Sequence, residues 1–271
     1  MAADRRQQPH GDVRFASRDV ECHLDRVYGP DCNRVLSGQG VGTGLRVADL
    51  GCGTGSTALW LASEVGPSGE VQAVELSQDQ LAVAATRASD EGLGNIQFTQ
   101  ASADATNLAR DAYDVVHCRF LLNHVVEPLP VIREMKALAK PGGLVIAFEM
   151  DANGLYSFPP TPCYEQLRAL LISAGKSQGK DLEIGPKLPM LFENAGLSCS
   201  GLALIHPIYL RGEEKRLWEF TMREARPYHG RYGWTVADYD RLAEALAVVG
   251  TNATTTVAQV PLVACWARKA D

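Results

Sequence analysis

Hydrophobic positions between residues 45 and 150 alternate between short continuous runs and helical spacing. The continuous runs have the length of buried strands and lie at 45–50, 71–76, 96–99, 113–118 and 144–148. The segments with helical spacing lie at 56–65, 77–92 and 132–139. Strands that alternate with helices predict a doubly wound, mostly parallel α/β sheet with right-handed crossovers.

The pattern is less regular after residue 150. Helices are expected at 162–174, 187–195, 213–225 and 236–249, and strands at 202–210 and 257–267. No segment has the composition of a linker, so we predict a single domain over residues 1–271. The irregular helices are expected to form a cap over the carboxyl edge of the sheet.

Composition and charge exclude several classes of protein. The chain has 46% hydrophobic and 21% charged residues, with 26 Lys and Arg against 32 Asp and Glu. The net charge of −6 argues against a nucleic-acid partner, which needs clustered basic residues. No apolar run is long enough to predict a membrane helix, and MAADRRQQPHG is not followed by the apolar core of a secretory signal. The 7 cysteines form no CxxC pair, which favours a cytoplasmic protein without a zinc site or disulfide framework.

The segment Val47–Gly55 places three glycines at alternate positions directly after the first predicted strand. Ligands of open α/β sheets bind at this edge, and glycines allow a close approach of the backbone. A dinucleotide loop needs a sixth-position glycine where this chain has Ser56, and a P-loop needs a lysine that is absent. Asp49 beside the loop would repel a diphosphate, whereas it suits a cationic nucleoside without phosphate.

The loop VADLGCGTG resembles motif I of the class I S-adenosylmethionine-dependent methyltransferases. The resemblance continues through Val74-Glu75-Leu76, Ala103-Asp104-Ala105, the strand at 113–116 and the segment at 138–143, in order and at normal spacing. It implies a Rossmann-like, seven-stranded, mostly parallel sheet with a helical cap, and S-adenosyl-L-methionine as cofactor. The parts expected within the domain are an N-terminal helical or lid segment at 1–44, a cofactor-binding core at 45–150, cap insertions with one strand at 151–255 and a closing strand at 256–271.

The resemblance also implies roles for particular residues. Gly51, Gly53 and Gly55 would line the methionine moiety, and Asp49 would order the loop and the ammonium. Glu75 would accept both ribose hydroxyls, and Leu76 would pack against the adenine. Asp104 would accept the adenine amino group, the Ala105 N–H would face a ring nitrogen, and the Cys118 carbonyl would accept from the ammonium. Further contacts with the methyl donor are expected from Tyr28, Cys52, Gln80 and Arg119.

The segment Arg119–His124 follows the fourth predicted strand, where the acceptor should meet the methyl donor. It is similar to a stretch of small-molecule tailoring and quinone C-methyltransferases, which suggests secondary metabolism. Arg119 either holds the donor carboxylate or pairs with Glu149 or Asp151. His124 is either a general base or a hydrogen-bonding partner of a neighbouring loop. No ligand cluster for a catalytic metal follows this strand.

Two other segments were considered. Gly175-Lys176-Ser177-Gln178-Gly179 matches the nucleophile elbow of hydrolases, but a helical pattern precedes it, so Gly175 is expected to end a helix instead. The turn-rich segment 227–232 is expected to be a lid.

The leading hypothesis is therefore an enzyme that methylates a small organic molecule at O, N, S or C, as a monomer or homodimer. The alternatives are a protein or RNA methyltransferase and a non-methylating protein that binds S-adenosylmethionine.

Overall fold

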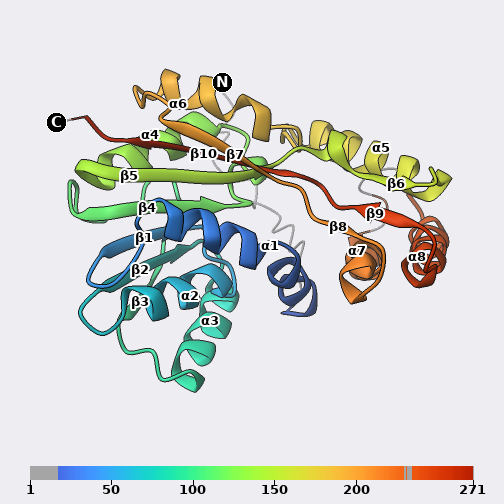
Figure 1. Ribbon diagram of the computed structural model, residues 1–271, viewed down its shortest axis with the longest axis horizontal. Coiled ribbons are helices and arrows are strands. Elements are labelled where there is room, and N and C mark those ends of the chain that lie inside the picture. Colours follow the sequence, from blue (N-terminus) through green and yellow to red (C-terminus); the bar gives the residue numbers. More distant parts are fainter. Residues whose placement is uncertain (1–17, 229, 231–233, 271) are drawn as a thin grey trace, which may run out of the picture.

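A seven-stranded sheet forms the centre of the computed structural model, which describes residues 18–228, 230 and 234–270 (Figure 1). Its strands, in the order β3-β2-β1-β4-β5-β10-β7, are Ile96–Gln100, Glu70–Glu75, Arg46–Leu50, Tyr113–Arg119, Ala139–Met150, Leu262–Arg268 and Gly201–Ile205. Strands β1 to β5 pair in parallel, and β10 is antiparallel to both β5 and β7. The predicted seven-stranded, mostly parallel sheet is confirmed.

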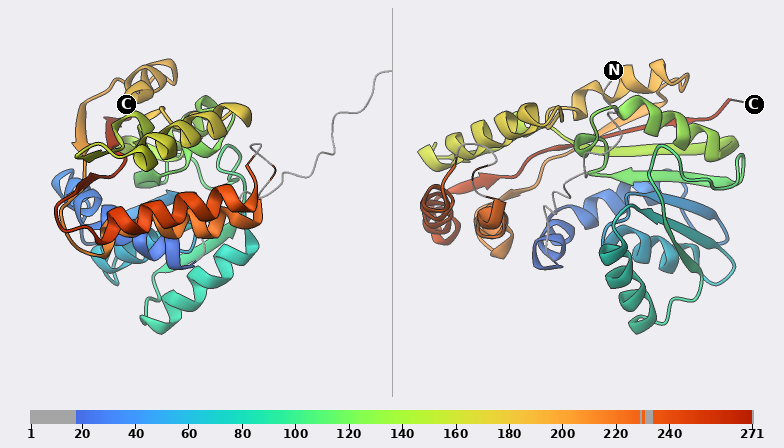
Figure 2. Two further views of the ribbon diagram at one scale, coloured as in Figure 1. Left: turned by 90° about the vertical axis from the view of Figure 1, so that its right-hand side faces the viewer. Right: turned by 180° about the vertical axis from the view of Figure 1, so that it is seen from behind.

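Helices cover both faces of this sheet (Figures 1 and 2). They are α1 Arg18–Gly38, α2 Ser56–Val65, α3 Gln78–Asp90, α4 Pro128–Leu138 and α6 Leu188–Asn194. Alternate strand residues point to opposite faces, so Val47 and Val115 pack in the core with α1 and α2, while Ala48 and Val116 pack in the core with α4 and α6. Both faces are apolar because the central strands are buried on both sides.

A second, three-stranded sheet was not predicted. Its strands are β6 Tyr156–Phe158, β9 Thr256–Ala258 and β8 Ile208–Tyr209, in the order β6-β9-β8. Along the chain, β6 follows β5, β9 precedes β10 and β8 follows β7. The small sheet therefore has the same strand order as β5-β10-β7 in the main sheet. It extends three strands beyond the carboxyl edge of the main sheet (Figure 1).

Two segments that were each predicted as one strand are each divided into two strands in the structure. The segment predicted at 202–210 divides into β7 and β8 at Pro207, and the segment predicted at 257–267 divides into β9 and β10 before Leu262, at Pro261. Proline has no N–H to donate to a strand ladder, which explains both interruptions.

Three helices pack together at the end of the molecule that carries the small sheet (Figure 2). They are α5 Pro162–Ser177, α7 Leu217–Ala225 and α8 Val236–Thr251. Short 3₁₀ turns precede or link these elements at Leu122–His124, Ala152–Gly154, Gly185–Lys187, Glu213–Arg216 and Arg226–Tyr228. Half of the predicted lid at 227–232, namely residues 229, 231 and 232, lies outside the described residues.

The end of helix α5 shows that the hydrolase-like segment 175–179 does not form a nucleophile elbow. Gly175 lies inside the helix, which ends at Ser177 with Gln178 as its cap, so the prediction that Gly175 ends the helix is wrong. A β-carbon at Gly175 would lie 2.9 Å from Leu182 Cγ, so the glycine allows the following loop to pack closely. Ser177 is helical and does not sit in a strand-to-helix elbow.

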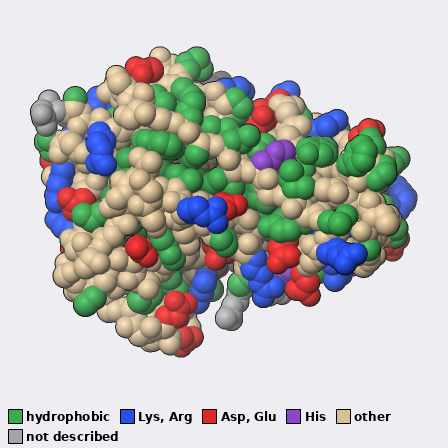
Figure 3. Space-filling view, viewed as in Figure 1, with side chains coloured by type: hydrophobic (Ala, Val, Ile, Leu, Met, Phe, Trp, Pro, Cys, Tyr) green, Lys and Arg blue, Asp and Glu red, His purple; other side chains and the backbone are tan. Residues whose placement is uncertain are grey.

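On the face drawn in Figure 3, Lys and Arg side chains are scattered among acidic and hydrophobic ones. Within the described part of the chain, no helix is both long and apolar enough to cross a membrane.

Candidate functional site

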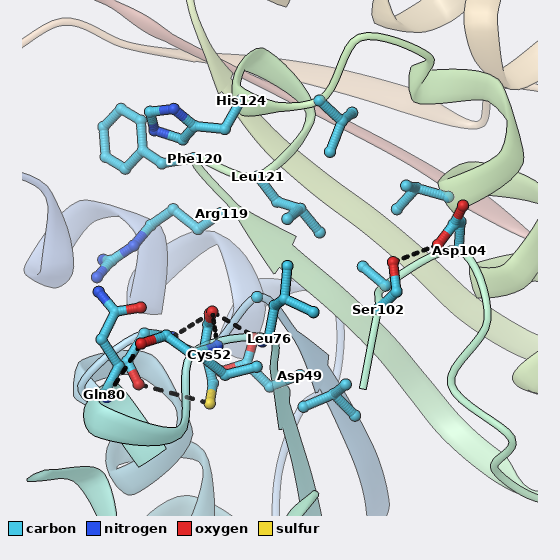
Figure 4. Close-up of a pocket in the computed structure, with 18 of the residues that line it drawn as sticks. Asp49, Cys52, Leu76, Gln80, Ser102, Asp104, Arg119, Phe120, Leu121 and His124 are labelled. Atoms are coloured by element: carbon cyan, nitrogen blue, oxygen red, sulfur yellow. Dashed lines mark hydrogen bonds between the residues drawn. The ribbon is translucent and has the colours of Figure 1, made fainter. Parts of the chain in front are cut away.

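A cavity of about 960 Å³ opens at the carboxyl ends of β1, β2 and β4 (Figure 4). It brings together most of the residues that were predicted from the sequence, namely Asp49, Gly51, Cys52, Gly53, Glu75, Leu76, Gln80, Asp104, Arg119 and His124. Four predicted residues do not line it, namely Tyr28, Gly55, Ala105 and Cys118. The volume is at the upper end of the range of small-molecule sites.

The glycine loop begins with a turn that only glycine adopts easily. Gly51 has a φ of 71°, and its N–H and that of Cys52 both donate to the Val74 carbonyl, at 2.8 and 3.0 Å. Gly55 has a φ of 91°, and a β-carbon there would lie 2.7 Å from Leu59 Cδ1. Gly55 therefore serves helix packing beneath the loop, which explains why it does not line the cavity.

Glu75 holds the loop from the end of β2. Its Oε2 accepts the Gly53 N–H at 3.1 Å, and its Oε1 accepts the N–H groups of Leu76 and Ser77 at 2.8 and 3.0 Å. A carboxylate offers about four acceptor positions, so Oε2 keeps capacity for a ligand hydroxyl.

The expected adenine end is bounded by Leu76 and Asp104. Leu76 has 55% of its surface exposed although it lines a cavity, which leaves an apolar side chain ready to contact a flat ring. Ser102 Oγ donates to Asp104 Oδ1, so the two side chains face the cavity as a pair (Figure 4). The Ala105 N–H, expected to face a ring nitrogen, instead donates to the Ser102 carbonyl at 3.1 Å.

A buried carboxylate–imidazole hydrogen bond lies at the floor of the cavity. Asp49 on β1 and His117 on β4 are direct neighbours across the two strands, and Asp49 Oδ1 lies 2.7 Å from His117 Nδ1. Asp49 is 2% exposed and His117 is fully buried. The sequence analysis placed Asp49 here but did not include His117, because only the register of β1 against β4 brings the two together.

Arg119 pairs with a residue other than those expected. Its Nη2 donates to Asp25 Oδ1 on α1 at 3.1 Å, so the predicted pairing with Glu149 or Asp151 is wrong. The second nitrogen, Nη1, is buried and has no partner among the described residues. The Cys32 thiol also interacts with the guanidinium. Arg119 lines the cavity, where a guanidinium suits a carboxylate ligand.

Glu149 caps the segment that follows β4. Its carboxylate accepts the N–H groups of Leu121, Leu122 and Asn123 at 2.9, 2.6 and 3.2 Å. Burial raises the pKa of Glu149 to about 7, against the opposing effect of these three hydrogen bonds. Glu149 therefore shapes the turn that carries His124.

Tyr28 and Cys118 lie beneath the cavity. The Tyr28 hydroxyl donates to the Val260 carbonyl at 2.8 Å, and the ring makes an edge contact with Phe120, with centroids 5.3 Å apart. Burial raises the pKa of the Tyr28 hydroxyl. Cys118 is fully buried in the core on the face of α4 and α6, where burial raises the pKa of its thiol. Neither residue lines the cavity, and the expected contact of the Cys118 carbonyl with the ammonium stays a prediction.

The segment that follows β4 lines the cavity with Phe120, Leu121 and His124 (Figure 4). Phe120 has a φ of 55°, a left-handed conformation that is uncommon for a bulky residue and is often found at functional sites. Removal from water, and secondarily the charge of Lys180, lowers the pKa of His124 to about 4. Lys180 and Gln178 also line the cavity, and no motif in the sequence pointed to them.

Comparisons with known proteins agree with this site. A family model described as a methyltransferase domain matches residues 42–179. The demethylmenaquinone methyltransferase of Lactococcus lactis is 36% identical over 124 residues, which are 46% of this chain and 47% of that protein. The chain spans about half the length of the curated relatives it matches.

Solved structures with the same fold include enzymes of different chemistry. A SAM-dependent methyltransferase from Aquifex aeolicus has a TM-score of 0.53 and 20% identity, covering 68% of this chain and 90% of that one. The [4+2]-cyclase SpnF has a TM-score of 0.58 and 23% identity, covering 91% of this chain and 81% of that one. At these identities the likeness concerns the fold alone. The matched domain covers about half of the chain and contains the glycine loop, so the chain belongs to the methyltransferase domain family, and the class I resemblance predicted from its motifs is confirmed.

Proposed function

We propose that the protein transfers a methyl group from S-adenosylmethionine to a small acceptor with an aromatic ring. The observation that carries this proposal is the row of three carboxylates, Asp49, Glu75 and Asp104, along one cavity. Such a row suits a ligand with a cationic end, ribose hydroxyls and an amino-bearing ring, and it disfavours a diphosphate. The bound cofactor would supply a methyl group already activated on a sulfonium.

Unpartnered polar atoms in the cavity walls support the fit of this cofactor. Asp49 Oδ2 and Arg119 Nη1 are buried without a hydrogen-bond partner among the described residues. Buried polar groups without a partner are uncommon in proteins and call for an explanation, such as a ligand or a water molecule. The ammonium and carboxylate of a methionine moiety would supply a partner of the right charge for each.

The acceptor is proposed to lie against Phe120, His124 and Lys180. Phe120 and Lys180, which both line the cavity, suit an acceptor with a ring and an acidic hydroxyl. Loss of the hydroxyl proton makes both the oxygen and the adjacent ring carbon more nucleophilic. The name of the Lactococcus relative supports a quinol and methylation at carbon. His124 is neutral near pH 7, but a pKa of about 4 makes it a weak base, so a general-base role is proposed only toward an acidic hydroxyl of the acceptor.

A turnover assay tests this function. The purified protein would be incubated with S-adenosylmethionine carrying an isotopically labelled methyl group and with a reduced naphthoquinone. Labelled methylated naphthoquinol together with S-adenosylhomocysteine is the expected result. Binding of the cofactor without turnover on any of a panel of quinols, phenols and enols would favour the non-methylating alternative.

A further inference from the structure

The pair formed by Asp49 and His117 contains two polar atoms that nothing in the described structure satisfies. Asp49 Oδ1 and His117 Nδ1 are 2.7 Å apart, whereas Asp49 Oδ2 and His117 Nε2 are buried and have no hydrogen-bond partner among the described residues. Both residues lie in the wall of the cavity. A buried carboxylate with a free oxygen is costly unless a donor reaches it.

Hydrogen-bond chemistry settles which ring nitrogen carries the proton. An ionised carboxylate only accepts, so Nδ1 must carry the hydrogen that joins the two side chains. In a neutral imidazole the other nitrogen, Nε2, then has no hydrogen and is an acceptor. Because Nε2 lies on the side of the ring away from Asp49, the anionic acceptor that this pair leaves without a donor from the described residues is Asp49 Oδ2.

A ligand that satisfies Asp49 Oδ2 must offer an N–H or O–H donor, and a positive charge favours it beside a carboxylate. A primary ammonium has three N–H donors and one positive charge, which fits this requirement. A carboxylate or a phosphate would add acceptors to a site that already has too many. The neighbouring Arg119 Nη1, two residues farther along β4, offers a donor for the carboxylate that accompanies an ammonium in an amino acid.

We propose that His117 is a positioning residue for the amino group of the methyl donor. Its Nδ1–H holds Asp49 so that Oδ2 is available to the ammonium, and Nε2 is left to accept from a water molecule. This inference rests on the proposed function, because it assumes that the cavity holds S-adenosylmethionine. It adds a side chain of β4, which orients Asp49, to the residues expected to bind the amino acid end.

A comparison of two ligands distinguishes a role of His117 in binding the amino group from a role in stabilising the fold. S-adenosylhomocysteine has the amino acid end, and 5′-methylthioadenosine has the same nucleoside without it. Calorimetric titration of His117→Leu is expected to show a loss of about 10- to 100-fold in affinity for S-adenosylhomocysteine, the size of one charge-assisted hydrogen bond. The affinity for 5′-methylthioadenosine is expected to stay within about twofold.

Matched variants keep the test decisive if His117→Leu folds poorly. His117→Asn retains an N–H close to the position of Nδ1 and is expected to recover much of the affinity that His117→Leu loses. Asp49→Asn removes the charge, and its selective loss should not add to that of His117→Leu, because the two residues act as one unit. His206→Asn alters a histidine that contacts the Gly154 carbonyl outside the cavity, and it should change neither affinity.

Two outcomes would overturn the inference while leaving the proposed function intact. One is an equal loss for both ligands in His117→Leu, and the other is unchanged affinity for S-adenosylhomocysteine. If the wild-type protein bound neither ligand, the proposed function itself would fail, and the inference with it.

Discussion

Arg119 Nη2 lies 3.1 Å from Asp25 Oδ1, and this contact joins the end of β4 to helix α1. The guanidinium is only 10% exposed, whereas the carboxylate is 40% exposed. Leu24, the neighbour of Asp25, lines the same cavity. Helix α1 is therefore part of the wall of the proposed cofactor site, although it lies before the glycine loop in the sequence.

Asp25→Asn is expected to weaken binding of S-adenosylhomocysteine by a few-fold, because Arg119 loses the anion that orients it. The half-exposed pair is worth about 0.5–1 kcal/mol, so a large loss is not expected. Calorimetry would measure the effect, with Asp31→Asn as control, because Asp31 pairs with Arg34 on the surface of the same helix. Equal behaviour of the two variants would show that Asp25 does not orient Arg119.

The raised pKa of Glu149 leads us to expect that the free energy of unfolding falls as the pH rises. Burial raises its pKa from 4.5 to about 7, so between these values the folded protein binds more protons at this group than the unfolded chain. The contribution of Glu149 to the free energy of unfolding is fully present below about pH 4.5 and is lost as the pH rises through about 7. This loss amounts to roughly 3 kcal/mol.

Glu149→Gln has no titrating group at this position and serves as the reference. The free energy of unfolding of the wild type minus that of Glu149→Gln should fall between about pH 5 and about pH 8. Urea denaturation at both pH values measures this difference, in which the other titrating groups cancel. A difference that stays constant or rises would contradict the raised pKa.

Lys180→Met should raise the pKa of His124. The positive charge of Lys180 is the second cause of the lowered pKa, after removal from water, so only part of the shift should disappear. Titration of the histidine ring signals by NMR would follow it. Lys176→Met is the control, because Lys176 pairs with Glu183 and does not line the cavity. If both variants left the titration of His124 unchanged, Lys180 would not act on it.

Leu76→Ser should weaken binding of the adenosyl ligands by about 1 kcal/mol, through lost apolar contact, with little change in stability. The side chain is already 55% exposed without a ligand, so the fold does not depend on its burial. Leu204→Ser alters a leucine of β7 that is 66% exposed and lies outside the cavity, and should leave binding unchanged. Unaltered affinity for 5′-methylthioadenosine in Leu76→Ser would show that Leu76 does not contact the adenine.

The part of the site formed by single strand ends was predictable from the sequence. Gly51, Glu75 and Leu76 each follow directly from a strand and its motif, so local patterns identify them. The contacts between distant segments were not predictable. Pairing of Asp49 with His117 depends on strand register, pairing of Arg119 with Asp25 depends on how α1 packs, and Lys180 reaches the cavity from a loop after α5.

In the fold, too, local features were predictable and contacts between distant segments were not. Alternating runs identified the parallel strands, because burial on both faces leaves a clear apolar signal. The small sheet was missed, although Pro207 and Pro261 carried a local signal that the long strands must break there. Its pairing with β6 joins segments about 100 residues apart, from Tyr156–Phe158 to Thr256–Ala258, which no local pattern encodes.

The row of carboxylates is expected to select a cationic, phosphate-free nucleoside. Competitive calorimetric titration of the purified protein with S-adenosylhomocysteine and with a nicotinamide dinucleotide measures this selectivity. Saturable binding of S-adenosylhomocysteine, weakened in Glu75→Ala, and no binding of the dinucleotide are the expected results. Tight binding of the dinucleotide with no response to adenosyl thioethers would show that the carboxylates do not select such a nucleoside.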